Sequence, residues 1–126
     1  MKLRVHGLHP RIIQLIVSWL ENRRAKVIVG GKSSPEILMK DQVFQGTVLG
    51  PTLWDVYFED VKVPVREQKF KEISFADDLN SHRTYDGNTD NKLIKKHAKK
   101  CQDAVHEWGR ANKSTFDTTT EFSSII

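Results

Sequence analysis

The stretch Ile73–Asn80 constrains the fold of this chain more than any other segment, because an apolar run leads directly into two adjacent aspartates. Side chains alternate between the two faces of a strand, so Ile73 and Phe75 are predicted to anchor one face of a β-hairpin. Asp77 and Asp78 then lie at the tip. The segment therefore predicts a hairpin that presents two carboxylates together.

Adjacent carboxylates repel each other unless a cation compensates their charge. Mg²⁺ prefers a few carboxylate oxygens and leaves its other positions to water and substrate phosphates, so Asp77 and Asp78 at a tight turn suit phosphoryl-transfer chemistry. The alternative is an ordinary surface turn, since Asp-Asp is a common turn dipeptide. The pair alone does not decide between the two.

The chain has 126 residues and a formal net charge of +4, which fits one domain or a piece of one with acidic partners. Seven Lys or Arg precede Ser33 against the single acid Glu21, and five lysines lie between Lys92 and Lys100. Such clusters suit phosphate backbones, or simply form solvated surfaces. With one cysteine, no signal-peptide pattern and no apolar run long enough to span a bilayer, we expect a soluble intracellular protein.

Hydrophobic periodicity and turn residues predict the remaining elements. A helix is expected from Pro10 to Glu21, and Gly30-Gly31 is expected to join two strands. Pro64 is expected to end a helix that begins at Pro51, with Asp55, Glu59 and Asp60 on its solvated side. Strands are expected over residues 26–29, 36–39 and 79–84. A helix is then expected with Thr89 as its N-cap and Gly109 as its end. Short strands 114–116 and 123–126 are expected on either side of a turn at Asp117.

The segment Gln45–Pro51 forms a defined loop before the second helix. A glycine beside a glutamine at a helix entrance lets a ligand approach the backbone closely, which makes Gln45 and Gly46 candidate binding residues. The alternative is an ordinary Gly-Pro helix start. A second candidate is a metal site at His97 and Cys101, one helical turn apart, completed by His106 or His82, although such residues are more often part of a core.

The order of these motifs resembles a known family. The Gln45–Pro51 loop is followed by a helix, by Phe75-Ala76-Asp77-Asp78, by a helix ending at Trp108-Gly109 and by Phe116-Asp117. This order resembles the palm of a reverse transcriptase, with the closest similarity to LINE-like non-LTR retrotransposons. The resemblance extends over nearly the whole chain and implies an α+β fold, a partial polymerase palm whose small antiparallel sheet carries a metal-binding hairpin packed on helices.

The resemblance also implies roles for individual residues. Asp77 and Asp78 would be catalytic and would bind metal, with two Mg²⁺ or Mn²⁺ ions in the intact domain. The partners would be an RNA template, a DNA primer, deoxynucleoside triphosphates and the remainder of the polymerase domain. Residues expected against template and nucleotide are Gln45, Gly46, Phe75 and Ala76, and candidate phosphate contacts are Arg23, Arg24 and Lys26.

Several departures from the family pattern limit what the chain can do alone. The family's first catalytic aspartate would lie upstream of Met1, and the fingers and thumb are missing. Thr120 stands where the family commonly has a lysine, and Phe44 stands where it usually has a proline. We therefore expect a palm fragment, residues 1–126, that is inactive in isolation and self-associates through exposed apolar edges. The alternative is a non-enzymatic basic nucleic-acid-binding remnant or a degenerate retroelement product.

Overall fold

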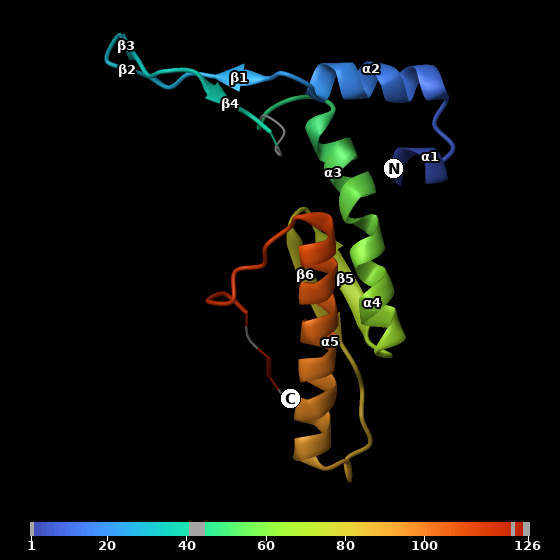
Figure 1. The fold of residues 1–126 in the computed structure, drawn as a ribbon. Coiled ribbons are helices and arrows are strands. Elements are labelled where there is room, and N and C mark those ends of the chain that lie inside the picture. The colour runs from blue at the N-terminus through green and yellow to red at the C-terminus, as the bar shows by residue number, and fades with distance from the viewer. Residues whose placement is uncertain (1, 41–44, 122, 125–126) are drawn as a thin grey trace. The chain divides into compact units, whose positions relative to one another are not determined.

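The computed structural model describes residues 2–40, 45–121 and 123–124, and it combines helices with small antiparallel sheets (Figure 1). This confirms the expected mixed α+β class. The chain divides into two compact units, Met1–Tyr57 and Phe58–Ile126, and each is described by itself.

The described part of the N-terminal unit contains the helices α1 (Lys2–Val5), α2 (Pro10–Leu20) and α3 (Gly50–Phe58). Helix α3 runs one residue into the second unit. The predicted helix from Pro10 is confirmed. Its apolar stripe is buried because Ile13 and Ile16 pack with Leu3 of α1. Partly buried side chains around this cluster are Leu8, Val17, Leu20, Leu53 and Val56.

Two short two-stranded sheets follow α2. Strand β1 (Arg24–Ala25) pairs with β4 (Ile37–Leu38), and β2 (Ile28–Val29) pairs with β3 (Lys32–Ser33), both antiparallel. The predicted turn is confirmed, since Gly30 and Gly31 both have positive φ. The predicted continuous strand 26–29 is wrong. The amide of Val27 donates to the Ser34 hydroxyl, and Pro35 has no N–H to extend the ladder.

Apolar side chains on these strands remain exposed. Ile28 and Val29 are 71% and 72% exposed, and Ile37 and Leu38 are about half exposed. A two-stranded ribbon has no second layer to cover it, so its apolar side chains contact solvent. Self-association of the chain stays a prediction.

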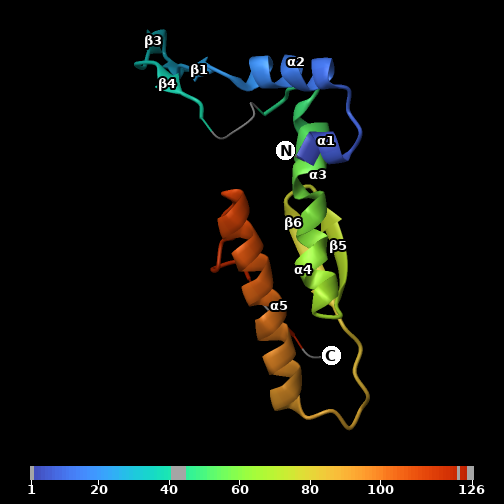
Figure 2. The same ribbon diagram turned by 45° about the vertical axis from the view of Figure 1, so that its right-hand side comes forward.

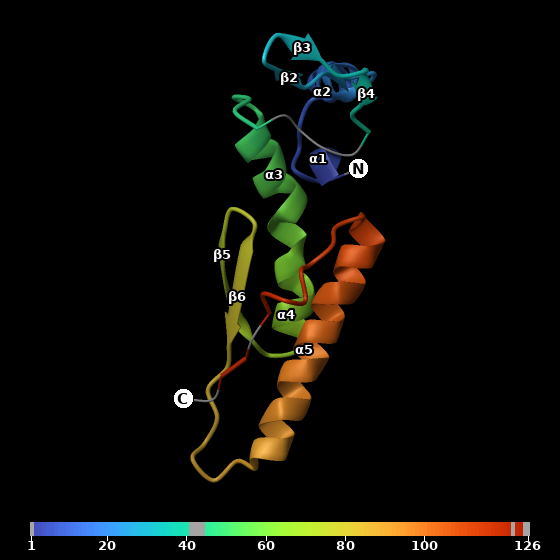
Figure 3. The ribbon, with the colours of Figure 1, turned by 90° about the vertical axis from the view of Figure 1, so that its left-hand side faces the viewer.

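The C-terminal unit begins with the short helices η1 (Glu59–Val61) and α4 (Lys62–Glu67), then the hairpin of β5 (Lys71–Phe75) and β6 (Asp78–His82), and ends with α5 (Asn91–Asn112). Helix α4 packs against both β5 and α5, as Figure 3 shows. The buried residues of this unit are Phe58, Val61, Val65, Cys101 and Gly109.

The prediction that Pro64 ends a helix is wrong. Pro64 is the third residue of α4, within the first helical turn, where the backbone N–H has no intrahelical acceptor and its loss costs little. Val65, the residue directly after Pro64, is completely buried. The chain therefore continues helically through Pro64 and buries the residue behind it.

The predicted helix is present as α5, but both of its ends differ from the prediction. Asp90, not Thr89, is the N-cap, and its side chain accepts a hydrogen bond from the Lys92 amide over 3.0 Å. The helix passes Gly109 and ends at Asn112. A Cβ at Gly109 would lie 2.6 Å from the Ser114 carbonyl oxygen, so this glycine provides space for the returning chain rather than a helix end.

The C-terminal segment after α5 is irregular, and the strand predicted for residues 114–116 is wrong. Phe116 instead packs against Trp108 and Phe58, with ring centroids 6.3 and 6.4 Å away. The predicted turn at Asp117 is confirmed, since its carboxylate accepts from the Thr119 amide. Of the second predicted strand, residues 123 and 124 have no strand structure and residues 125 and 126 lie outside the described part of the chain.

Asp60, expected on a solvated face, has a partner in α5 instead. The indole N–H of Trp108 donates to Asp60 Oδ1 over 3.0 Å, and the Trp108 ring meets Phe58 edge-on. Hydrogen bonds to a charged acceptor are stronger than neutral ones. This contact links the start of the C-terminal unit to its last helix.

We predict that Trp108→Phe lowers the free energy of unfolding by about 1–2 kcal/mol, because it removes the donor to Asp60 while keeping an aromatic ring. Urea unfolding followed by circular dichroism measures the change. Glu107→Gln, on an exposed position of the same helix, serves as the control and should stay within about 0.5 kcal/mol of the parent. Equal effects of the two substitutions would contradict the role of this hydrogen bond.

Candidate functional site

The β5–β6 hairpin places both aspartates at one end. Its register pairs Phe75 with Asp78 and leaves Ala76 and Asp77 as a two-residue turn. Asp77 lies in the turn and Asp78 is the first residue of β6, and both are exposed. The predicted hairpin and the position of the two carboxylates are confirmed, while their metal-binding and catalytic roles stay predictions.

The predicted anchors of this hairpin are wrong. Ile73 is 63% exposed and Phe75 is 81% exposed, so their face does not pack on the helices. The opposite face does, because Glu72 forms an ion pair with Arg66 of α4. The predicted alternation of faces is confirmed, but the face that contacts α4 carries Glu72 rather than Ile73 and Phe75.

The Arg66–Glu72 pair is a contact that sequence reasoning missed. Arg66 donates to Glu72 Oε1 through both Nε and Nη2, and this hydrogen bonding lowers the pKa of the Glu72 carboxyl below its usual value. The same contact raises the pKa of Arg66. Because α4 and β5 are joined by a short turn, the pair fixes the direction in which the strand leaves the helix.

Backbone geometry at the turn is unusual. Ala76 has a φ of +52°, in the left-handed region that disfavours residues with a Cβ. Residues in this region cluster at functional sites, where the surrounding structure holds them. The strained residue lies directly before the first aspartate.

The two aspartates fit part of a Mg²⁺ site. They provide adjacent, exposed carboxylate oxygens, which are the ligands that Mg²⁺ prefers, and they leave room for water and phosphate oxygens. No group of three or more His, Cys, Asp or Glu that could hold a metal ion occurs among residues 2–40, 45–121 and 123–124. The described residues thus place two candidate carboxylate ligands at the hairpin tip, and metal binding by them stays a prediction.

The Gln45–Gly46 segment is exposed and belongs to the N-terminal unit. Gly46 has a φ of +86°, which favours glycine at this position. Thr47 accepts a hydrogen bond from the Gly50 amide, and α3 begins there as predicted. Residues 41–44, with the departure at Phe44, lie outside the described residues.

The three N-terminal candidate phosphate contacts have protein partners. Arg24 and Lys26 both reach Glu36, at 3.0 and 3.5 Å, so one carboxylate partly compensates two cations. Arg23 donates to the Leu20 carbonyl at the end of α2 and lies over the Trp19 ring. Arg23 therefore caps a helix, and Arg24 and Lys26 remain exposed candidates.

The four residues predicted as a second candidate metal site have separate surroundings. Cys101 is buried, and that burial raises the pKa of its thiol, which disfavours the thiolate that metals need. His97 stacks on Tyr85, and its Nδ1 lies 3.2 Å from the Tyr85 hydroxyl. His82 is exposed on β6, and His106 contacts Glu121. These residues form no metal cluster within the described chain.

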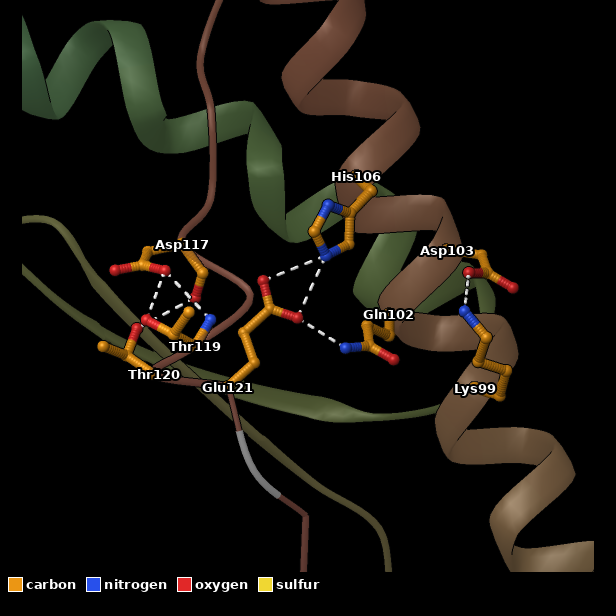
Figure 4. Close-up of polar contacts among 8 residues, drawn as sticks. All are labelled: Lys99, Gln102, Asp103, His106, Asp117, Thr119, Thr120 and Glu121. Carbon is orange, nitrogen blue, oxygen red and sulfur yellow. Dashed lines mark hydrogen bonds and ion pairs between the residues drawn. The ribbon is translucent and has the colours of Figure 1, made fainter.

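A carboxylate contact closes the C-terminal segment against α5 (Figure 4). His106 Nε2 lies 2.9 Å from Glu121 Oε1, and Gln102 donates to the same carboxylate. Burial raises the pKa of Glu121, but the hydrogen bonds from His106 and Gln102 outweigh it, so the pKa lies below its usual value. Thr120, where the family commonly has a lysine, hydrogen-bonds Asp117 within the preceding turn.

Comparison with known proteins identifies no relative: no family model, no curated protein and no solved structure matches this chain. Within the described residues, no helix is both long enough and apolar enough to cross a membrane.

We predict that Ala76→Gly raises the free energy of unfolding by about 0.5–1 kcal/mol, because glycine tolerates positive φ without the penalty of a Cβ. Urea unfolding measures the difference. Ala98→Gly, inside α5, is the matched control and should lower stability by about 1 kcal/mol. If both substitutions destabilise equally, Ala76 is not strained.

The Glu121 contact predicts a pH-dependent contribution to stability. Since the folded-state pKa is depressed, the stabilisation is present above the ordinary value of 4.5 and is lost as the pH falls through the folded-state pKa. Glu121→Gln should therefore cost about 0.2–1 kcal/mol at pH 7, and this cost should shrink as the pH falls below 4.5. Thermal unfolding over this pH range tests this, and a difference that does not change with pH would contradict it.

Proposed function

We propose that this chain is part of the palm of a reverse transcriptase of the LINE-like non-LTR type, acting inside the cell in RNA-templated DNA synthesis. The observation that carries the proposal is the two-residue turn of the β5–β6 hairpin, which presents Asp77 and Asp78 side by side at an exposed tip. The order of motifs along the sequence supports it. The proposal concerns the intact domain, and the chain alone is expected to be inactive.

The roles of the residues follow from their chemistry. Asp77 and Asp78 would hold Mg²⁺ or Mn²⁺, which when bound stabilise the attacking 3′-oxygen and the leaving pyrophosphate. Phe75 is 81% exposed beside this tip, so its ring is available to a primer or nucleotide. Ala76 sets the direction of the turn through its left-handed backbone.

Gln45 and Gly46 are proposed to position template and nucleotide. Their exposure and the positive φ of Gly46 support this, since a ligand can approach the backbone there without meeting a Cβ. Arg24 and Lys26 are proposed as phosphate contacts despite sharing Glu36. Arg23 is a weaker candidate because its guanidinium already caps α2.

The alternative is a basic nucleic-acid-binding remnant without catalysis. The lysine-rich face of α5 favours it, because Lys92, Lys95, Lys96 and Lys100 are exposed. Binding without chemistry would depend on salt and not on the two aspartates. A degenerate product that does not fold would show neither property.

The test is Mg²⁺-dependent primer extension on an RNA template by this chain and by a form extended upstream through the missing catalytic strand. We expect extension only by the longer form, with Asp77→Asn or Asp78→Asn lowering the rate at least about a hundredfold, because each removes a metal ligand. Asp86→Asn, which removes an exposed carboxylate in the turn before α5, is the matched control and should leave the rate within about twofold.

Two results would overturn the proposal. One is a folded extended form that does not polymerise, which would leave only the alternative of nucleic-acid binding without catalysis. The other is polymerisation that survives both aspartate substitutions, which would place the metal site elsewhere.

A further inference from the structure

The end of the β5–β6 hairpin opposite the aspartates carries a cluster of cations that the polymerase proposal does not use. Figure 2 shows the chain leaving β6 there and running to the start of α5. Two shallow clefts lie at this end, of about 200 and 300 Å³, and both are lined by Lys69 and Arg83. The first is completed by Glu67, Gln68, His97 and Lys100, and the second by Lys71, His82 and Thr84.

Three separate parts of the C-terminal unit contribute these cations. Lys69 follows α4 and has a φ of +62°, which turns the chain sharply at the helix end. Arg83 follows β6, and Lys100 lies one turn after His97 on α5. Among the described residues, Glu67 is the one carboxylate that lines either cleft, so cations outnumber acids in both.

The position of Arg83 is fixed by contacts on several sides. Its guanidinium lies 4.8 Å from the Tyr85 ring centroid and 5.9 Å from that of Phe70, and Nη1 donates to the Gln68 carbonyl. Tyr85 in turn stacks on His97 at 5.7 Å. A guanidinium held in this way is pre-organised for an oxyanion, because it loses little side-chain freedom on binding.

Ion pairing distinguishes the cations at the clefts from several other cations of this unit. Among the residues that the structure describes, no carboxylate forms an ion pair with Lys69, Lys71, Arg83 or Lys100, whereas Lys62, Arg66 and Lys99 of the same unit are all paired. The pKa of His97 is lowered, first by partial burial and then by Arg83, Lys100, Lys96 and Lys69, which agrees with a positive potential at the cleft.

The size and extent of the cluster indicate the kind of anion. A volume of about 200 Å³ is below that of usual small-molecule sites, so the cleft suits a single phosphate group better than a whole nucleotide. The second cleft continues from it through two shared residues. Beyond them, Lys92, Lys96 and Lys100 follow one line on α5 over about 12 Å of helix. A row of cations of this length fits a polyanion with regularly spaced charges.

We propose that the two clefts and the adjoining lysines of α5 bind the phosphodiester backbone of a single-stranded nucleic acid, with Lys69, Arg83 and Lys100 at the centre. This site needs neither Asp77 nor Asp78 and no metal. It therefore goes beyond the polymerase proposal, and each of the two proposals can be tested without the other.

The test is fluorescence anisotropy of a labelled oligothymidylate of about twelve nucleotides with the full chain in EDTA, between about 50 and 200 mM salt. We expect affinity to fall linearly with salt on logarithmic axes. Lys69→Ala with Lys100→Ala should weaken binding about tenfold at low salt and reduce the slope by about 1.4, since each phosphate contact on a single strand contributes about 0.7. Within the part of the chain that the structure describes, neither side chain has a hydrogen bond or an ion pair. Circular dichroism checks that the variant folds.

Two controls separate this site from general charge and from catalysis. Lys32→Ala with Lys40→Ala removes the same charge from exposed positions of the N-terminal unit and should leave affinity within about threefold. Asp77→Asn with Asp78→Asn should also leave it within threefold, so the catalytic proposal can fail while this one holds.

Three outcomes would overturn the inference. The first is no binding of the oligonucleotide by the folded chain. The second is equal loss in the cleft variant and the N-terminal variant, which would mean attraction by net charge alone. The third is equally tight binding of a polyglutamate peptide of the same length, which would mean that the surface recognises acidic polypeptides rather than phosphodiesters.

Discussion

The packing of the C-terminal unit depends on the burial of Val61 and Val65. Both side chains are completely buried, and each is expected to contribute about 1.5–3 kcal/mol relative to an exposed position. They belong to η1 and α4, and α4 packs against both β5 and α5. Because α4 contacts both neighbours, its position determines where the hairpin emerges and where Lys69 lies. Both candidate sites of this unit therefore depend on two small apolar side chains.

Local patterns predicted the elements well, and tertiary packing caused most of the errors. The helix from Pro10, the Gly30-Gly31 turn and the β5–β6 hairpin follow from neighbouring residues alone, and all three are present. The sequence predicts a helix end at Gly109. The structure instead requires glycine there because a Cβ would collide with the Ser114 carbonyl oxygen. The Ser114 carbonyl comes close to Gly109 because the chain reverses direction after α5, and the pattern of neighbouring residues does not predict that reversal. Phe116 was likewise assigned to a strand, whereas aromatic packing on α5 determines its position.

The two candidate sites differ in how far sequence could reveal them. Asp77 and Asp78 are adjacent in the chain, and the tip of a hairpin is a local feature, so their position could be predicted. Lys69, Arg83 and Lys100 come from three separate segments, and nothing in the sequence indicates that they meet. A cation two residues before an aromatic residue, as in Arg83-Thr84-Tyr85, is the available sequence signal, but it indicates a site only when the packing of α4, β5 and α5 is known.

The hairpin also sets the distance between its acidic tip and its basic end. Asp78 and Arg83 are five residues apart along an extended segment, which spans about 17 Å at about 3.4 Å per residue. A nucleic-acid strand that engages both ends must be long enough to cover this span, and a shorter oligonucleotide would reach one end at a time. The length of β6 thus sets a minimum footprint for any ligand that engages both.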